Sequence, residues 1–367
     1  MAELQIIEQI LDLARWAPSG DNTQPWRFEI VDGSNIVIHG FDTRDHCVYD
    51  LDGHPSQLSI GALLETLSIA ATQHGLRAEI TRRHATPDTQ PIFEAQLVAD
   101  SSVRLDPLAA QIALRSVQRR PMRLRPLTSA EKLALEAAVS PLHRVTWLEG
   151  AALKLRTARL MFDNAKLRLT MPEAYRVHRE IIHWGVRYSE DRVPDQALGV
   201  DPLTARLMRW IMADWQRVAF FNRYLAGTLA PRVQMDWVPS LCCAAHFVIT
   251  AAQPAQSIDD YVAAGRAMQR FWLTLTGLGL AMQPEMTPLI FARYVREGRV
   301  FSSTASMQGQ AQGLARKLEA LIGPQTSHMA VFMGRIGAGP SATARSTRRP
   351  LTDLFATRAE GVNSGDR

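Results

Sequence analysis

Cysteines, aromatic side chains and long apolar runs are all scarce in this chain of 367 residues. The three cysteines are Cys47, Cys242 and Cys243, and their odd number and uneven spacing exclude a disulfide scaffold and favour a reducing compartment. No apolar stretch approaches the roughly 20 residues that cross a bilayer. The first residues do not have the pattern of a signal peptide. We therefore expect a cytoplasmic protein without a membrane partner.

Several motifs of chemistry are also missing. The chain has no Gly-x-Ser-x-Gly, no P-loop and no Gly-x-Gly-x-x-Gly. Acidic and histidine residues gather between Asp42 and His54, but their spacing matches no zinc or calcium pattern, so we expect no metal site. The net charge of +5 comes without a long basic stripe interleaved with aromatics, which argues against a nucleic-acid partner.

The composition that is present is globular, with 46% hydrophobic and 21% charged residues. Apolar periodicity predicts an α+β fold. Helices are expected at 3–15, 55–74 and 261–282, from 128 onward, through 151–235, and as a short basic helix around 115–119. Strands are expected at 27–31, 35–39, 76–82, 93–98, 237–250 and 327–335.

Two long apolar helices are each followed by a Gly-Leu pair, at 75–76 and at 279–280. This repetition predicts two related halves packed around one core, with sheets flanked by helices. We place the first half at 1–105 and the second at 106–355. Residues 356–367 are polar and are expected to form a mobile tail.

The segment from 17 to 28 is the first candidate site. Its proline, glycine and Asp-Asn pair favour a loop with left-handed backbone positions. Such a loop either stops a helix before a strand or presents hydrogen-bonding groups to the edge of a flat heteroaromatic ring. The candidate residues are Pro18, Ser19, Gly20, Asn22 and Gln24.

The string Arg15-Trp16-Ala17-Pro18-Ser19, with Asn22, Gln24-Pro25-Trp26 and Phe28, resembles the signature of the nitroreductase superfamily of FMN-dependent flavoproteins. The resemblance implies that Pro18, Ser19 and Gly20 lie against the flavin ring. It also implies that Asn22 and Gln24 shape the loop and its pocket.

Two arginine-rich segments are the second candidate. Arginines four apart on a helix share a face, and guanidinium groups suit phosphate, although a solvated basic helix is the alternative. Arg115, Ser116 and Arg119 are similar to the family's phosphate-binding motif, although Val117 stands where a hydroxyl residue is common. A basic pair near the C-terminal end of the family's fold closes over the same phosphate, which implies Arg345 and Arg348 here.

The stretch after Gly279 is the third candidate. On its own, a glycine pair after a long helix is usually only a helix stop. By resemblance, this region leads to contacts with the reactive edge of the flavin, which implies Gln283, Pro284 and Glu285.

The order of the motifs differs from that of an ordinary nitroreductase, in which the phosphate arginines come before the Pro-Ser loop in each subunit of a homodimer. Here the loop comes first and occurs once. This order resembles the tandem nitroreductase-like proteins, in which one chain imitates the dimer, and the nitroreductase-like regions fused to adenylyltransferases. We expect one flavin site per chain, in a monomer that imitates a dimer or in a homodimer.

The leading functional hypothesis is an FMN-dependent oxidoreductase. NADH or NADPH would drive the two-electron reduction of an electron-poor small molecule such as a nitroaromatic or a quinone, without an obligatory catalytic side chain. The alternatives are a non-catalytic flavin-binding or flavin-sequestering protein, and a specialised FMN-dependent dehydrogenase or oxidase in a biosynthetic pathway. The Trp and Phe residues of 151–235 would either cover the ring as a lid or pack as core helices.

Overall fold

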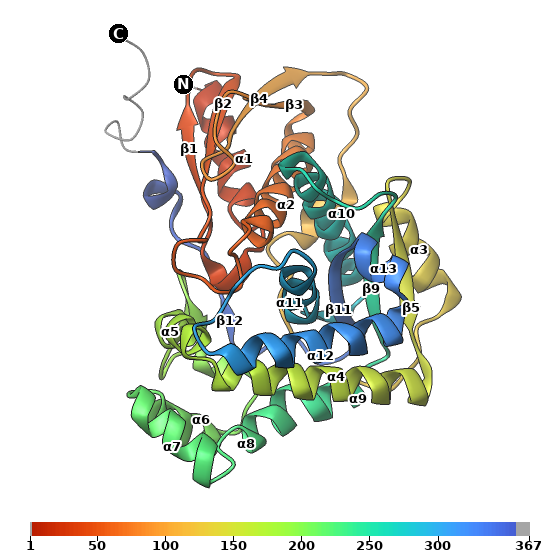
Figure 1. Cartoon of the computed structure of the whole chain (residues 1–367). Coiled ribbons are helices and arrows are strands. Elements are labelled where there is room, and N and C mark those ends of the chain that lie inside the picture. Colours follow the sequence, from red (N-terminus) through yellow and green to blue (C-terminus); the bar gives the residue numbers. More distant parts are fainter. Residues whose placement is uncertain (1, 357–367) are drawn as a thin grey trace.

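A computed structural model of the chain describes residues 2–356, which form two four-stranded antiparallel sheets with helices packed between and around them (Figure 1). The prediction of an α+β fold is confirmed. None of the described helices is long and apolar enough to cross a membrane. The predicted mobile tail lies outside the described residues, apart from Ala356.

The first sheet has the strand order β1-β2-β4-β3. Its elements are α1 (Ala2–Ala14), β1 (Trp26–Ile30), β2 (Asn35–Gly40), α2 (His54–Ala71), β3 (Leu76–Arg82) and β4 (Ile92–Ala99). Strand β4 alternates as an antiparallel strand with one buried face should: Phe93, Ala95 and Leu97 are buried in the core that α1 and α2 share. The helices and strands predicted for this part are confirmed to within a few residues.

The second sheet has the order β5-β9-β11-β10. Its elements are α3 (Ser129–Val139), β5 (His143–Leu148), β9 (Ala245–Ala251), α10 (Ile258–Gly277), β10 (Leu280–Pro284) and β11 (Ala330–Ala338). In both sheets the strands lie in the chain order first, second, fourth, third, and the long helix comes between the second and the third strand. The two sheets therefore share one connectivity.

The two long helices, α2 and α10, pack against each other at the centre of the molecule (Figure 1). Gly61 and Gly265 meet at their crossing, where a Cβ on either glycine would collide with a carbonyl oxygen of the other helix. Gly61 precedes Gly75 by the same number of residues as Gly265 precedes Gly279. The close approach therefore uses equivalent positions of the two helices.

The remaining elements belong mostly to the chain after β5. The helices are α4 (Gly150–Thr170), α5 (Pro172–Ile181), α6 (Pro202–Ile211), α7 (Trp215–Tyr224), α8 (Leu229–Arg232), α9 (Val238–Leu241), α11 (Thr287–Arg296), α12 (Ala305–Ile322) and α13 (Pro324–Met329). The short strands are β6 (Ile182–His183), β7 (Tyr188–Ser189), β8 (Val193–Pro194) and β12 (Arg345–Ser346). Helices α4 and α12 lie side by side, and α6 and α7 project beyond them (Figure 1).

The prediction of a short basic helix around Arg115 and Arg119 is wrong. The backbone there is extended: Val117 forms a parallel bridge with Met282 of β10, and Gln118 N donates to Met282 O at 2.9 Å. Pro121 disfavours helical geometry in the residue before it, and the exposed edge of β10 offers the hydrogen bonds that a very short helix lacks.

Other boundaries in the second part also differ. The strand predicted over 237–250 begins only at Ala245, because Trp237 to Leu241 is helical. The helix predicted over 261–282 ends at Gly277; Gly279 then takes a left-handed φ of 69° and β10 begins. Strands β5 and β12 were not predicted, and the helical pattern expected through 151–235 is wrong between α5 and α6, where the short strands β6, β7 and β8 lie.

Candidate functional site

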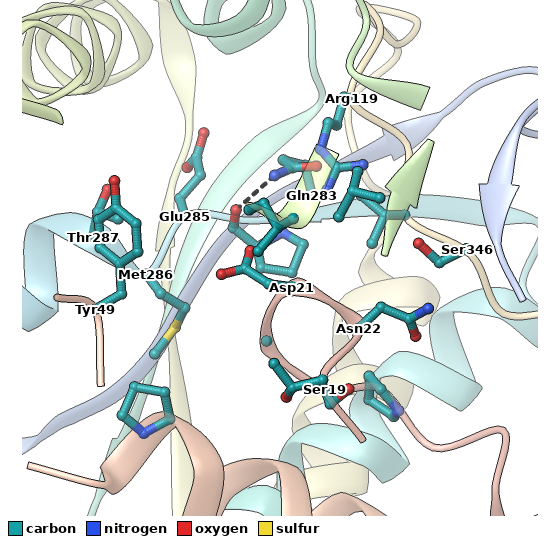
Figure 2. Close-up of a pocket in the computed structure, with 18 of the residues that line it drawn as sticks. Ser19, Asp21, Asn22, Tyr49, Arg119, Gln283, Glu285, Met286, Thr287 and Ser346 are labelled. Atoms are coloured by element: carbon teal, nitrogen blue, oxygen red, sulfur yellow. Dashed lines mark hydrogen bonds between the residues drawn. The ribbon is translucent and has the colours of Figure 1, made fainter. Parts of the chain in front are cut away.

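Residues from both sequence ranges, before and after 105, line a cavity of about 410 Å³ (Figure 2). This volume is within the usual range for small-molecule sites. The cavity is lined by all but one of the predicted site residues: Pro18, Ser19, Gly20, Asn22, Arg115, Ser116, Arg119, Gln283, Pro284, Glu285, Arg345 and Arg348. The exception is Gln24, which is buried behind the loop; it donates to Glu190 O at 2.8 Å and accepts from Arg349 N at 3.0 Å.

The loop after α1 takes the left-handed backbone that its sequence predicts. Asp21, Asn22 and Gln24 have φ values of 51°, 64° and 51°. Asn22 fixes this shape, because its amide donates to Glu190 O at 3.0 Å while its Oδ1 accepts from Arg348 Nη1 at 2.8 Å. The resulting turn directs Asp21 into the cavity, toward Gln283 (Figure 2).

Arg115, Arg345 and Arg348 gather at one end of the cavity. Arg115 Nη2 donates to Trp16 O and Arg348 Nε to Ala17 O, both at 2.9 Å. Arg345 lies over the Trp16 ring at 5.1 Å. Among the described residues, no carboxylate forms an ion pair with any of the three. We call these residues the arginine cluster.

The three arginines of the cluster are removed from water without a carboxylate among the described residues to balance their charge. Burial lowers the pKa of Arg115 far below its ordinary value, and repulsion from Arg348 and Arg345 lowers it further. Burial, with repulsion from Arg345, also lowers the pKa of Arg348 to about 9. The Nε atoms of Arg115 and Arg345 are buried without a hydrogen-bond partner. The described residues therefore supply no counter-charge to the cluster, and a bound anion would stabilise it.

Arg119 does not join the arginine cluster, contrary to the predicted shared helix face. Four residues of extended backbone cover about 13 Å, so Arg119 reaches a different part of the cavity from Arg115. Its Nη1 donates to Ala197 O at 3.2 Å, and burial lowers its pKa to about 10 against the attraction of Asp21. Burial raises the pKa of Asp21 to about 6, while Arg119 and Arg168 act in the opposite direction.

The end of β10 forms the opposite wall from Asp21. Gln283 Nε2 donates to Pro284 O at 2.9 Å, while its Oε1 is buried without a donor. The polar groups of Glu285 form hydrogen bonds with other residues of the protein. Its carboxylate accepts from His246 Nδ1 at 2.7 Å and from Arg335 Nη1 at 3.0 Å, and its backbone N donates to Met333 O. Glu285 therefore holds this wall in place, and its side chain has no group free for a ligand.

His246 completes this buried network. Its Nε2 must donate to Ser240 O, which lies at 2.9 Å, because a carbonyl can only accept. Burial alone would lower the pKa of His246, but the Glu285 carboxylate raises it to about 10. The imidazole therefore carries a positive charge near neutral pH and donates from both nitrogens.

Sequence reasoning missed the residues at the far end of the cavity. Tyr49 Oη and His178 Nε2 lie 2.9 Å apart, and burial beside Arg168 lowers the pKa of His178 to about 3. Arg168 Nη2 donates to Asp236 Oδ1 at 3.2 Å. Five methionines also line the cavity: Met161, Met208, Met212, Met235 and Met286.

The predicted aromatic lid is wrong in one respect. Region 151–235 does wall the cavity, but with methionines, isoleucines and polar groups, and none of its Trp or Phe residues lines it. Helix α6 shows why: Met208 faces the cavity, whereas Leu203, Leu207 and Trp210 lie on the outer face and are exposed. The i, i+4 spacing of Met208 and Met212 was no signal, because the exposed Leu203 and Leu207 have the same spacing.

One of three comparisons with known proteins, that with family models, agrees with the resemblance. A sequence model of the nitroreductase family matches residues 3–52, which confirms the resemblance over that segment. An uncharacterized protein from Mycobacterium tuberculosis is 24% identical over 356 residues, which are 93% of this chain and 47% of the relative. The chain therefore spans about half the length of that relative. A nitroreductase-like family protein from Bacillus cereus, covering 69% of this chain and 96% of its own, has a TM-score of 0.34 and 13% identity.

Proposed function

We propose that the cavity binds one FMN and that the chain is a flavin-dependent oxidoreductase. The match at residues 3–52 supports this general class. The observation that carries the proposal for the cofactor is the arginine cluster, in which Arg115, Arg345 and Arg348 face one cavity without a carboxylate partner among the described residues. A phosphate monoester supplies the missing negative charge and accepts several guanidinium hydrogen bonds at once.

The rest of the cavity fits a flat polar ring. The turn from Pro18 to Asp21 forms one side of the cavity with its backbone. Gln283 and Pro284 form the opposite side. Gln283 Oε1 is a buried acceptor without a donor, which suits an N–H group at the edge of the ring. When bound, FMN supplies the two-electron chemistry, and the protein positions the ring and the substrate.

The acceptor would occupy the end of the cavity at Tyr49 and His178. Burial raises the pKa of Tyr49, so its hydroxyl stays protonated and can donate to an oxygen of a nitroaromatic or quinone. His178 is neutral, and in the tautomer protonated at Nε2 it would donate to Tyr49 Oη and leave the tyrosine proton for the acceptor. Flexible methionine side chains adapt to substrates of varied shape. NADH or NADPH would bind at the same end of the cavity first and leave before the acceptor binds. This end must therefore admit the nicotinamide and then the acceptor.

We further propose that the two sheet units are counterparts of the two subunits of an ordinary nitroreductase dimer. Their common connectivity and the equivalent glycines at the α2–α10 crossing support this proposal. The division at residues 105 and 106 follows from it. In this arrangement, the ring loop comes from the first half and the arginine cluster from the second, apart from the backbone around Trp16.

The experiment is purification followed by FMN titration and anaerobic mixing with NADH or NADPH. We expect a yellow protein whose flavin absorbance bleaches on mixing. Arg345→Gln should weaken FMN binding by about tenfold, the loss of one charge-assisted contact, whereas Arg316→Gln on the exposed face of α12 should not. Binding without bleaching would favour a non-catalytic flavin binder. A colourless protein that refuses FMN would overturn the proposal.

A further inference from the structure

A second cavity, of about 420 Å³, lies on the other side of helix α11. Thr287 and Ile290 of this helix line the first cavity, whereas Arg293 and Arg296 line the second. The second cavity has no residue in common with the first. It is therefore a separate place at which a ligand could bind.

The second cavity contains two buried hydrogen-bond donors without acceptors. Arg293 is 6% exposed; its Nε donates to Asp52 Oδ2 at 2.7 Å, but its Nη2 is buried without a partner. Ser327 of α13 is 5% exposed, and its Oγ is also buried without a partner. Buried donors of this kind usually find an acceptor, so both point to a ligand atom with free lone pairs.

The rim of the second cavity is basic. Arg296 is exposed, and no hydrogen bond or ion pair joins it to another of the residues that the structure describes. His328 is exposed beside it. The acidic group of this rim is Glu297, which already pairs with Arg299 at 3.5 Å. Asp52 balances Arg293, whereas Glu297 and Glu319 attract Arg296 without forming an ion pair with it, so its guanidinium has no direct partner among the described residues.

One wall of the cavity contains two aromatic rings, and the Arg293 guanidinium covers part of it, 5.7 Å from the centroid of the Tyr261 ring. The His54 and Tyr261 rings are stacked, with centroids 3.7 Å apart and an interplanar angle of 12°. Leu289 and Pro254 add apolar surface. The cavity is larger than an inorganic anion requires, and this wall suits an organic group attached to the anion.

We propose that the second cavity binds a small organic phosphate in addition to the FMN of the first cavity. A phosphate group has several acceptor oxygens that point in different directions, which matches donors on α11 and α13. Its charge is balanced by Arg296, and its organic part lies against the His54–Tyr261 wall. The proposal rests on this cavity alone and does not require FMN in the other one.

The test is calorimetric titration of the FMN-saturated protein with phenyl phosphate, because excess FMN keeps the arginine cluster occupied. We expect one phenyl phosphate per chain. Arg296→Gln should weaken its binding by about tenfold and Ser327→Ala by severalfold, as expected for a charged and a neutral hydrogen bond. Arg316→Gln removes an exposed arginine elsewhere on the surface and should change nothing. Thermal melts check that each variant is folded.

Several results would overturn the proposal. They are the absence of binding to the folded wild type, an equal loss in Arg316→Gln, and binding of benzoate as tight as that of phenyl phosphate. If the protein proves not to bind FMN, the same titration is made on Arg345→Gln without FMN. If Arg345→Gln loses phenyl phosphate binding while Arg296→Gln keeps it, the phosphate binds in the first cavity and the proposal is overturned.

Discussion

Asp21 is the residue in which backbone strain and electrostatics meet most directly. Its left-handed backbone would suit glycine better, and yet its carboxyl group lies in the cavity between the influences of Arg119 and Arg168. Burial raises its pKa to about 6, so the group is mostly ionised at pH 7 and mostly protonated at pH 5. A single side chain can therefore change the charge beside the bound ring.

The first prediction concerns the reduction potential of bound FMN. Asp21→Asn should raise the midpoint potential by on the order of tens of millivolts, because it removes a negative charge that disfavours the anionic reduced flavin. An anaerobic dye titration measures the shift. Asp88→Asn, in an exposed turn of the first sheet, is the matched control. An unchanged potential in Asp21→Asn would refute this role.

The second prediction is the pH dependence of that shift. The Asp21 carboxyl has a raised pKa of about 6, so its negative charge is present above pH 6 and is lost as the pH falls through 6. The difference in potential between wild type and Asp21→Asn should therefore be full at pH 8 and small at pH 5. The titration is repeated at both values. A difference that stays constant would show that the carboxyl does not titrate in this range.

Residues at the far end of the cavity show what sequence alone could not provide. Tyr49 and His178 are 129 positions apart, and no local pattern links them before the chain folds. The loop from Pro18 to Asn22, in contrast, has its turn residues in consecutive positions, and both its shape and its place in the cavity follow the prediction. Local chemistry was predictable, whereas the pairing of distant side chains was not.

At the scale of elements, the crossing of α2 and α10 is the closest contact between the two sheet units. The helices approach so closely that backbone touches backbone at Gly61 and Gly265. Both glycines lie inside long helices, where glycine is otherwise unfavourable by roughly 1 kcal/mol relative to alanine. Their presence there is explained by the space that the opposite helix requires.

The third prediction tests this crossing. Gly265→Ala should destabilise the protein by at least about 1–3 kcal/mol, because its Cβ collides with backbone that cannot move away easily. Gly313→Ala in α12 is the control, since no atom lies within 4 Å of the added Cβ and higher helix propensity should stabilise it slightly. Urea unfolding measures both. Equal effects of the two substitutions would contradict this account of the crossing.

The elements also differ in how well the sequence predicts them. In the first sheet, strands β3 and β4 alternate between exposed and more buried positions, so their pattern is visible locally. Strand β10 has only five residues directly after a long helix, and the extended segment at Arg115 to Arg119 lies along its edge. Both take their form from partners far away in the chain, and a local pattern therefore predicted helix in both places.

At the scale of the whole molecule, the two sheet units share connectivity but do not offer equivalent sites. Strand β10 ends at the cavity, whereas Arg82 at the end of β3 does not line it and pairs instead with Asp259 at 2.8 and 2.9 Å. After α3 the chain turns directly through Pro141 into β5, without a second loop like that from Pro18 to Asn22. The proposed tandem arrangement would thus leave one site per chain.

The fourth prediction is the stoichiometry of FMN. Native mass spectrometry should find one FMN per chain at saturation, because only one end of the paired sheets combines the loop with the arginine cluster. If the protein forms a homodimer, dilution to monomers should leave the ratio of FMN to chain unchanged. Two FMN molecules per chain, or loss of FMN together with dissociation of a dimer, would contradict a site completed within a single chain.

The position of Arg345 and Arg348 in the chain has a consequence for the timing of biosynthesis. The ring loop leaves the ribosome early, whereas these two arginines follow it by more than three hundred residues. At about 5–20 residues per second, the interval is on the order of tens of seconds. During that time the nascent chain has the loop without the cluster that would hold the phosphate. If the cavity binds FMN as proposed, loading of the cofactor would therefore be a late event, after strand β12 has paired with β7.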